Sequence, residues 1–263
     1  MVPSLSIVFI AFNLLFSVAL PVFLAVFLMK KLKIRLTPFL VGCAVWIIFA
    51  LLLEQCMHTL VLNRFGKIIQ SRTLYYALYG GLAAGIFEET GRFLAMKTLL
   101  KPYYGKDGTA LMYGAGHGGV EVLLILGIGM LNNLIYAILC NTGHLELLTA
   151  PLTEAQQIQF QGVIDQLVSV SPLTFLAAPF ERISAVILHI ALSVLVWLSV
   201  TRKKFWMFPL AIFLHFVMDA GAVLLSKTGI GTLLTELVIF AFSCLVSFVA
   251  WKLWKRNKVA SCD

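Results

Sequence analysis

Apolar residues occur along this chain in stretches that are long enough to cross a lipid bilayer. A spanning helix needs about 20 predominantly apolar residues. Seven stretches reach that length: about 4–29, 38–62, 73–100, 109–140, 172–200, 206–226 and 230–251. The pattern predicts an all-α polytopic membrane protein, a single bundle of about seven transmembrane helices with no second domain.

One connection is long enough to contain a helix of its own. Residues 141–171 separate the fourth and fifth apolar stretches and include TEAQQIQFQGVIDQLV. This mixture of polar and apolar residues predicts an amphipathic helix that lies on the membrane surface. Its polar residues are ordinary ones, so we expect a surface helix rather than a lid over a site.

The first apolar stretch is predicted to stay in the membrane. Residues 4–29 are longer than the apolar region of a signal peptide, which has about 7–15 residues. No basic residue precedes them, and four basic residues follow between positions 30 and 35. We therefore expect a first transmembrane helix here.

Basic residues in the connections predict the orientation. Fourteen lie on one side of the predicted bundle: Lys30, Lys31, Lys33, Arg35, Lys97, Lys101, Lys106, Arg202, Lys203, Lys204, Lys252, Lys255, Arg256 and Lys258. Four lie on the other: Arg64, Lys67, Arg72 and Lys227. Because cytoplasmic connections carry the excess of Lys and Arg, we expect the N-terminus outside and the C-terminus inside a bacterial cytoplasmic membrane.

Composition agrees with the membrane interpretation. Of 263 residues, 60% are hydrophobic and 12% charged, and the mean hydropathy is +0.96. The net charge of +8 is accounted for by the connections, so no nucleic-acid partner is indicated. The cysteines, at positions 43, 56, 140, 244 and 262, form no CxxC pair, which indicates packing rather than disulfides or a thiolate zinc site.

Charged and imidazole side chains inside the predicted helices need an explanation, because each costs about 2.5–3.5 kcal/mol at the bilayer centre. They cluster on four helices: Glu88, Glu89 and Arg92; His117 and Glu121; Glu181, Arg182 and His189; His215 and Asp219. Glu54, His58 and Glu236 lie nearer the predicted outer ends of other helices, where solvent can reach them.

Four of these residues lie at one depth. Counted from the cytoplasmic end of each helix, Glu88 is 12 residues in, His117 is 9, His189 is 11 and His215 is 10. At about 1.5 Å per residue this spread is roughly 5 Å. The coincidence across four helices predicts a functional polar site rather than unrelated helix contacts.

Spacing within the helices adds detail. His117 with Glu121, and His215 with Asp219, are four residues apart, so each carboxylate could accept the second N–H of its imidazole. Arg92 is three and four residues from the adjacent glutamates, so it can neutralise one and leave the other for proton transfer. The small residues of GGLAAG and GAGHGG predict close approach of the third and fourth helices, as they would in plain membrane packing.

The residues allow two mechanisms of hydrolysis. In one, histidines hold a zinc ion and a glutamate is the general base. In the other, a glutamate and a histidine activate water without metal, and a polar side chain stabilises the oxyanion. The chain has no HExxH motif, so the sequence leaves both mechanisms open.

Several short motifs resemble a known family. EETGR, YGAGH and HFVMD resemble the EExxR, FxxxH and HxxxN/D motifs of the Abi/CAAX-type glutamate intramembrane protease superfamily, which includes CPBP and PrsW-like proteases. GHGGVE and FERxxxxxxH resemble most closely the YhfC family of intramembrane metalloproteases. The likeness covers about residues 75–225, and four motifs in this order are fairly specific.

The resemblance implies roles for the clustered residues. Glu88 would activate water with support from Glu89 and Arg92, and His117 and His215 would complete the centre. Asp219 takes the place of an oxyanion-stabilising Asn, and an ionised aspartate cannot donate a hydrogen bond. Asp219 must then be protonated, orient His215 or bind a metal.

The third histidine of the layer, His189, together with Asp219, favours zinc held by His117, His189 and His215, with no cofactor if the glutamate mechanism applies. Glu121 and Glu181 are supporting residues.

The expected function is an endopeptidase that cuts a membrane-embedded or membrane-proximal peptide near the cytoplasmic half of the bilayer. Its partners would be a membrane protein or peptide substrate and the lipid bilayer. Two other functions stay open: a non-catalytic scaffold or chaperone of the same fold, and a proton- or metal-coupled transporter. The latter is disfavoured because the chain shows no inverted repeats.

Overall fold

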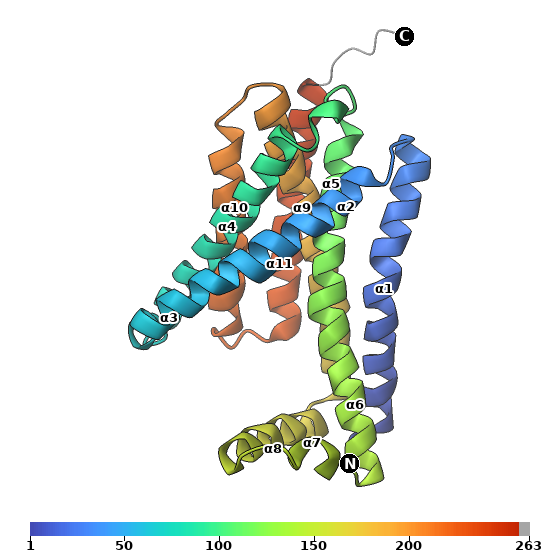
Figure 1. The fold of residues 1–263 in the computed structure, drawn as a ribbon, viewed down its shortest axis with the longest axis vertical. Coiled ribbons are helices and arrows are strands. Elements are labelled where there is room, and N and C mark those ends of the chain that lie inside the picture. The colour runs from blue at the N-terminus through green and yellow to red at the C-terminus, as the bar shows by residue number, and fades with distance from the viewer. Residues whose placement is uncertain (258–263) are drawn as a thin grey trace.

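The computed structural model describes residues 1–257, and all regular structure in this range is helical (Figure 1). The elements are α1 Ser4–Leu32, α2 Thr37–Trp46, η1 Ile47–Glu54, α3 Gln55–Ile69, α4 Thr73–Lys97, η2 Lys101–Tyr103, α5 Gly108–Glu121, η3 Val122–Gly127, α6 Ile128–Thr142, α7 Glu146–Thr149, α8 Glu154–Ser169, η4 Pro172–Leu176, α9 Ala177–Thr201, α10 Met207–Ser226 and α11 Thr232–Arg256. The all-α prediction is confirmed. Lys258 and Cys262 lie outside the described residues, and the other four cysteines are free thiols.

Six helical segments are long and apolar enough to span a membrane. They are Ser4–Leu32, Thr37–Ile69, Gly108–Thr142, Pro172–Thr201, Met207–Ser226 and Thr232–Arg256. Each coincides with a predicted span, so the chain is an integral membrane protein. The predicted span 73–100 corresponds to α4, a helix of 25 residues. It is not among the six because Glu88, Glu89 and Arg92 interrupt its apolar stretch.

Two of the long segments contain π-helical turns. The segment Thr37–Ile69 includes η1, which ends at Glu54, and the segment Gly108–Thr142 includes η3, which begins directly after Glu121. π-Helical turns are rare and occur often at functional sites. Each of these turns therefore adjoins an acidic residue inside an otherwise apolar segment.

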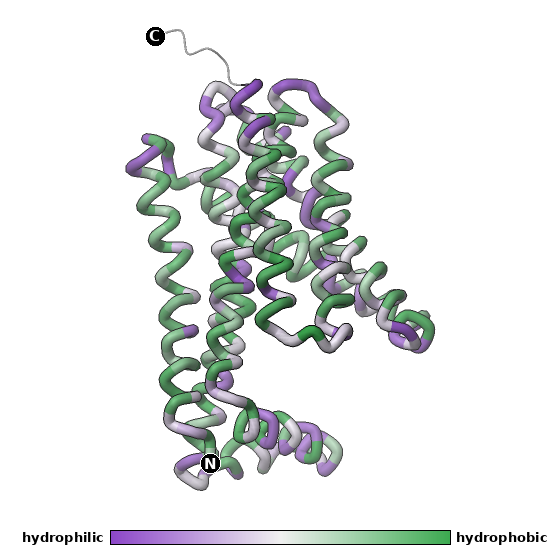
Figure 2. Tube along the Cα trace, turned by 180° about the vertical axis from the view of Figure 1, so that it is seen from behind, coloured by the Kyte–Doolittle hydropathy of each residue, from purple (hydrophilic) through white to green (hydrophobic). Residues whose placement is uncertain are grey.

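The two ends of the bundle differ in polarity. The C-terminal end of α11 lies at the same end as the α1–α2, α4–α5 and α9–α10 connections, and the N-terminus lies at the opposite end near α6 and α8 (Figure 1). Hydrophobic residues dominate between these ends (Figure 2). The connections that carry most of the Lys and Arg residues thus share one end of the molecule, as the predicted orientation requires.

The predicted helix in the long connection is present as α8. Thr153 and Gln156 form a capping box at its N-terminus, in which Thr153 Oγ1 accepts a hydrogen bond from the backbone N–H of Gln156 and the Gln156 side chain accepts one from the backbone N–H of Thr153. This reciprocal cap satisfies two backbone donors that a helix start leaves free. The helix is confirmed, and its location on a membrane surface stays a prediction.

The central helix of the bundle is α9. In the most apolar 18-residue stretch of the segment Pro172–Thr201, 72% of the residues are buried inside the bundle. In the other five spans the corresponding share is 22–33%. Its C-terminal end is fixed by Asp107, which accepts hydrogen bonds from Trp197 Nε1 at 3.0 Å and from Arg202 Nη2 at 2.9 Å. A buried, anchored α9 places His189 in the middle of the bundle.

Glycines of α4 and α5 bring these helices close to neighbours other than the predicted ones. A Cβ on Gly116 would lie 2.0 Å from the carbonyl oxygen of Phe39, so α5 approaches α2, and a Cβ on Gly85 would lie 2.8 Å from the carbonyl oxygen of Ile212, so α4 approaches α10. The expected α4–α5 pairing is wrong, because the glycines of these two helices face other neighbours. The small residues still bring backbones together, and the site forms between the resulting helix pairs.

We predict that Gly116→Ala destabilises the protein by about 1–3 kcal/mol, because the added methyl group forces α2 and α5 apart. Thermal unfolding in detergent micelles measures the change. Gly129→Ala is the control, since a Cβ there meets nothing within 4 Å. Equal transition temperatures for the two variants would contradict the close α2–α5 contact.

Candidate functional site

Four helices bring the polar layer together. Glu88 on α4, His117 on α5, His189 on α9 and His215 on α10 are all buried. The ring centroids of His117 and His189 are 4.8 Å apart, and those of His189 and His215 are 5.4 Å apart. Residues that the sequence separates by more than 120 positions therefore form one cluster.

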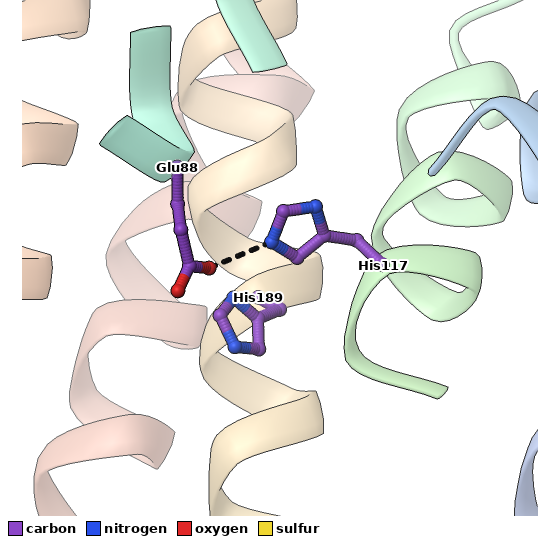
Figure 3. Close-up of side chains that lie close together, drawn as sticks. All are labelled: Glu88, His117 and His189. Atoms are coloured by element: carbon purple, nitrogen blue, oxygen red, sulfur yellow. Dashed lines mark hydrogen bonds and ion pairs between the residues drawn. The ribbon is translucent and has the colours of Figure 1, made fainter. Parts of the chain in front are cut away.

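Glu88 and His117 form a pair at the centre of this cluster. His117 Nε2 lies 2.8 Å from Glu88 Oε2, with the two side chains pointing toward each other and His189 beside them (Figure 3). The second ring nitrogen of His117, Nδ1, is buried and has no hydrogen-bond partner among the described residues. The pair thus offers a carboxylate and an imidazole that no arginine contacts.

Glu89, adjacent in sequence, has a different environment. Arg92 Nη1 donates to its two carboxylate oxygens at 2.6 and 2.7 Å, and both side chains are fully buried. Glu89 Oε1 also lies 2.8 Å from Nδ1 of His215. Neighbouring residues point about 100° apart on a helix, which is why Glu88 and Glu89 face different partners. Arg92 neutralises one glutamate and leaves the other, as the spacing predicted.

His189 is held from both sides. Arg92 Nη2 donates to its Nδ1 at 3.1 Å, and because a guanidinium has no acceptor, Nδ1 carries the lone pair and Nε2 the proton. Nε2 donates to Glu121 Oε2 at 2.6 Å. The other oxygen of Glu121 accepts from Arg182 Nη1 at 2.8 Å, and Arg182 also pairs with Glu181. Glu121 thereby fixes the tautomer of His189.

This arrangement corrects one expectation from helical spacing. Glu121 was expected to orient His117 four residues earlier. Because α5 packs against α9, the Glu121 side chain spans that interface to His189, while His117 reaches Glu88 on α4. His117 and Glu121 share one face of α5, so a contact between them is possible. Each instead contacts a residue of another helix.

His215 connects the buried ion pair to the open part of the site. Its Nδ1 faces Glu89 at 2.8 Å and its Nε2 faces Asp219 Oδ2 at 3.5 Å. A doubly protonated imidazolium satisfies both carboxylates. The expected i,i+4 pair of His215 and Asp219 is therefore present. Asp219 is its accessible member, since 39% of its side chain is exposed.

Contacts between acids and bases continue without a break across the site. In order, the series contains Glu181, Arg182, Glu121, His189, Arg92, Glu89, His215 and Asp219. A cavity of about 110 Å³ opens beside it, with Glu88, Glu121, Glu181, His189, His215 and Asp219 in its lining. Water-sized molecules can therefore reach the carboxylates, while His117 lies behind Glu88.

Three of these residues could hold a metal ion. Glu88, His117 and His189 each offer one ligand atom, and these atoms lie within 4.8 Å of one another. Two histidines and a glutamate are a ligand set that catalytic zinc uses, with a fourth position left open. In this ligand set Glu88 takes the place that was predicted for His215. Both ring nitrogens of His189 are engaged, so a metal would replace one of those contacts.

A second cluster adjoins the site on the side of η1. Glu54 is 7% exposed and accepts from His58 Nε2 at 3.1 Å, while His58 Nδ1 lies 2.7 Å from the Tyr79 hydroxyl. Glu54 lies on η1, which contacts α4, the helix of Glu88 and Glu89. The sequence placed Glu54 and His58 at the solvent-facing end of a helix and gave no signal for Tyr79, which follows no spacing rule relative to Glu88.

Comparison with known proteins decides the family. The model of the YhfC intramembrane metalloprotease family matches residues 16–240. The chain belongs to the YhfC family. The uncharacterized membrane protein YhfC of Bacillus subtilis strain 168 is 34% identical over 230 residues, which cover 86% of this chain and 88% of that protein. No solved structure matches at a significant level.

All the residues of the polar cluster lie within the stretch that matches the YhfC family. We predict that Arg92→Leu destabilises the protein by about 3–5 kcal/mol, because it leaves Glu89 charged and buried without its main partner. Glu88→Gln is the matched control on the same helix, since its amide keeps a hydrogen bond to His117. Chemical unfolding in micelles measures the free energy of unfolding of both variants. An equal loss in the two would contradict a stabilising role that is particular to the Glu89–Arg92 pair.

Proposed function

We propose that this chain is an intramembrane metallopeptidase that hydrolyses a peptide bond of a membrane protein or peptide. The observation that carries the proposal is the grouping of Glu88, His117 and His189 beside a cavity that water can enter. The family name supports the same activity. Four carboxylates contact imidazoles inside an apolar bundle, and packing alone would not offset the cost of burying these polar groups.

The charge of the site favours a bound cation. Five carboxylates and two guanidinium groups share the cluster: Glu88, Glu89, Glu121, Glu181 and Asp219, with Arg92 and Arg182. Three negative charges are thus left for histidine protons or a metal to balance. Burying unbalanced charge is costly in a bundle interior, so a divalent ion on Glu88, His117 and His189 would stabilise the cluster.

The residues around the ligands have separate tasks. A divalent metal supplies Lewis acidity, which activates water and polarises the scissile carbonyl. Glu121 keeps His189 in one tautomer and orientation through the Nε2–H contact. Arg92 holds Glu89 ionised in the bundle interior, and Glu89 in turn orients His215.

Asp219 is the residue best placed to move protons. Its carboxylate is the accessible end of the Glu89–His215–Asp219 series. Its carboxylate would take a proton from the attacking water and pass it to the leaving amine nitrogen. His215 Nε2–H would donate to the oxyanion, the task that an Asn performs in the Abi/CAAX-type motifs. This division gives Asp219 a role that an ionised aspartate can fill.

A metal-free route uses the same cavity. Glu88 would then accept the proton from water, with His117 Nε2 as its partner at 2.8 Å, and the chain would stand within the Abi/CAAX-type glutamate protease superfamily by mechanism as well as by motif. Metal content separates the two routes.

The topology of the proposal includes α4 as a seventh span in one transmembrane domain. Its Glu88, Glu89 and Arg92 face the bundle interior and are buried, so lipid need not solvate them. The shared end of the basic connections supports the N-terminus outside and the C-terminus inside.

We predict that the purified protein binds roughly one zinc ion per chain and that His117→Ala or His189→Ala abolishes this binding. His144→Ala is the control, because His144 is exposed, with 62% of its side chain accessible. Elemental analysis and isothermal titration measure the stoichiometry. Full zinc occupancy in both site variants would contradict the assigned ligands.

We predict that Glu88→Gln, His117→Ala and His215→Ala each lower peptide cleavage at least about 100-fold in proteoliposomes. Asp219→Asn should shift the pH profile of the rate as well, since it removes the proposed proton acceptor. Glu146→Gln, in the long connection, serves as control. Undiminished cleavage in the first three variants would refute the catalytic assignment.

A further inference from the structure

An apolar groove lies between the start of α9 and the start of α11. It encloses about 520 Å³ and is lined by η4, α9 and α11 residues such as Leu173, Leu176, Phe180, Leu233 and Leu237. Glu236 is its one charged lining residue. The groove is therefore large enough for several side chains of a bound segment and presents a single acidic group to them.

The groove continues toward the catalytic cavity. Ala177 lines the groove and Glu181, four residues on, lines the cavity; on α11 Glu236 lines the groove and Ile239, three residues on, lines the cavity. Residues three or four apart lie on one face of a helix. The same faces of α9 and α11 thus form both spaces, and a chain that fills the groove is directed at the carboxylates.

Two acidic groups at the junction of groove and cavity are incompletely paired within the described residues. Glu236 Oε2 is buried and has no hydrogen-bond partner among the described residues. Glu181 is 42% exposed at its side chain, and its partner Arg182 is shared with Glu121. Burying a carboxylate in an apolar wall without a hydrogen-bond donor costs free energy. A cationic group bound in the groove would therefore stabilise Glu236.

We propose that this groove binds an extended segment of the substrate polypeptide that carries a lysine or arginine, and that Glu236 pairs with that basic side chain. This inference rests on the proposed peptidase function and names the substrate class of the same site. Apolar side chains of the segment contact the leucine walls, and the basic side chain fixes the register. That register determines which peptide bond lies beside Glu88 and Asp219.

The charge of the groove distinguishes this occupant from a phospholipid. A lipid tail fits apolar walls, but its phosphate would lie beside Glu181 and Glu236, which repel it. A lysine or arginine side chain buries its aliphatic stem and presents its cation at the tip. A basic peptide segment therefore satisfies both the walls and the acid.

Photo-crosslinking of the full chain in nanodiscs tests the proposal. A photoreactive residue replaces Leu233, which lines the groove and is 73% exposed, in a Glu88→Gln background that holds substrate without cleaving it. The probes are hydrophobic synthetic peptides that differ at one scanned position, with lysine, norleucine or glutamate. We expect the lysine peptide to crosslink about tenfold more than the norleucine peptide at the best position.

Charge variants of the groove sharpen the test. Glu236→Gln should abolish the preference for lysine, and Glu236→Lys should transfer it to the glutamate peptide. Glu154→Gln, which alters another acidic residue at the start of α8, should leave the preference unchanged. The reversal by charge exchange keeps the test valid even if one variant is less stable.

Each alternative outcome has a defined meaning. Equal crosslinking of the three peptides, or crosslinks to phospholipid or to a second copy of the chain, would overturn the groove assignment. Cleavage of these peptides by the zinc-loaded Glu88 protein, measured in parallel, reports on the peptidase function separately. A charge-dependent crosslink without cleavage would leave the binding site standing and count against the peptidase.

Discussion

The buried Glu89–Arg92 ion pair determines how the rest of the site is arranged. Both side chains are fully inaccessible, and separating them would leave a charge in the bundle interior at a cost of several kcal/mol. Arg92 also donates from Nη2 to His189, and Glu89 Oε1 also contacts Nδ1 of His215. The pair thus fixes two histidines from two other helices and keeps α4, α9 and α10 in register.

Glu88 is available for chemistry because of this pairing. Arg92 is three residues from Glu89 and four from Glu88, so its spacing would allow it to pair with either. It pairs with Glu89, and Glu88 therefore contacts His117 and faces the cavity. Two adjacent carboxylates on one helix therefore have separate tasks. One is structural and charged, and the other offers a ligand or a base beside water.

Much of the architecture follows from the sequence, because the cost of exposing polar groups to lipid is local and additive. Most span boundaries are predicted to within about five residues, as in 230–251 against Thr232–Arg256, but the second predicted span, 38–62, is too short because the segment continues to Ile69. The depth count gathers Glu88, His117, His189 and His215 because helix rise is regular. Which helices become neighbours is not local, so the glycines of GAGHGG were assigned to the wrong partner and Glu121 to the wrong histidine. The π-helical turns η1 and η3, and with them the position of Glu54, also depend on tertiary packing that no periodicity reports.

The account depends most on the claim that Glu88, His117 and His189 form a metal site within the hydrogen-bond network. X-ray absorption at the zinc edge of the purified, zinc-loaded protein tests this most directly. We predict two imidazole nitrogens and one carboxylate oxygen, with metal–ligand distances of about 2.0–2.2 Å, and the loss of one imidazole in His117→Ala. A spectrum with no histidine ligands, or one with sulfur ligands, would contradict the account.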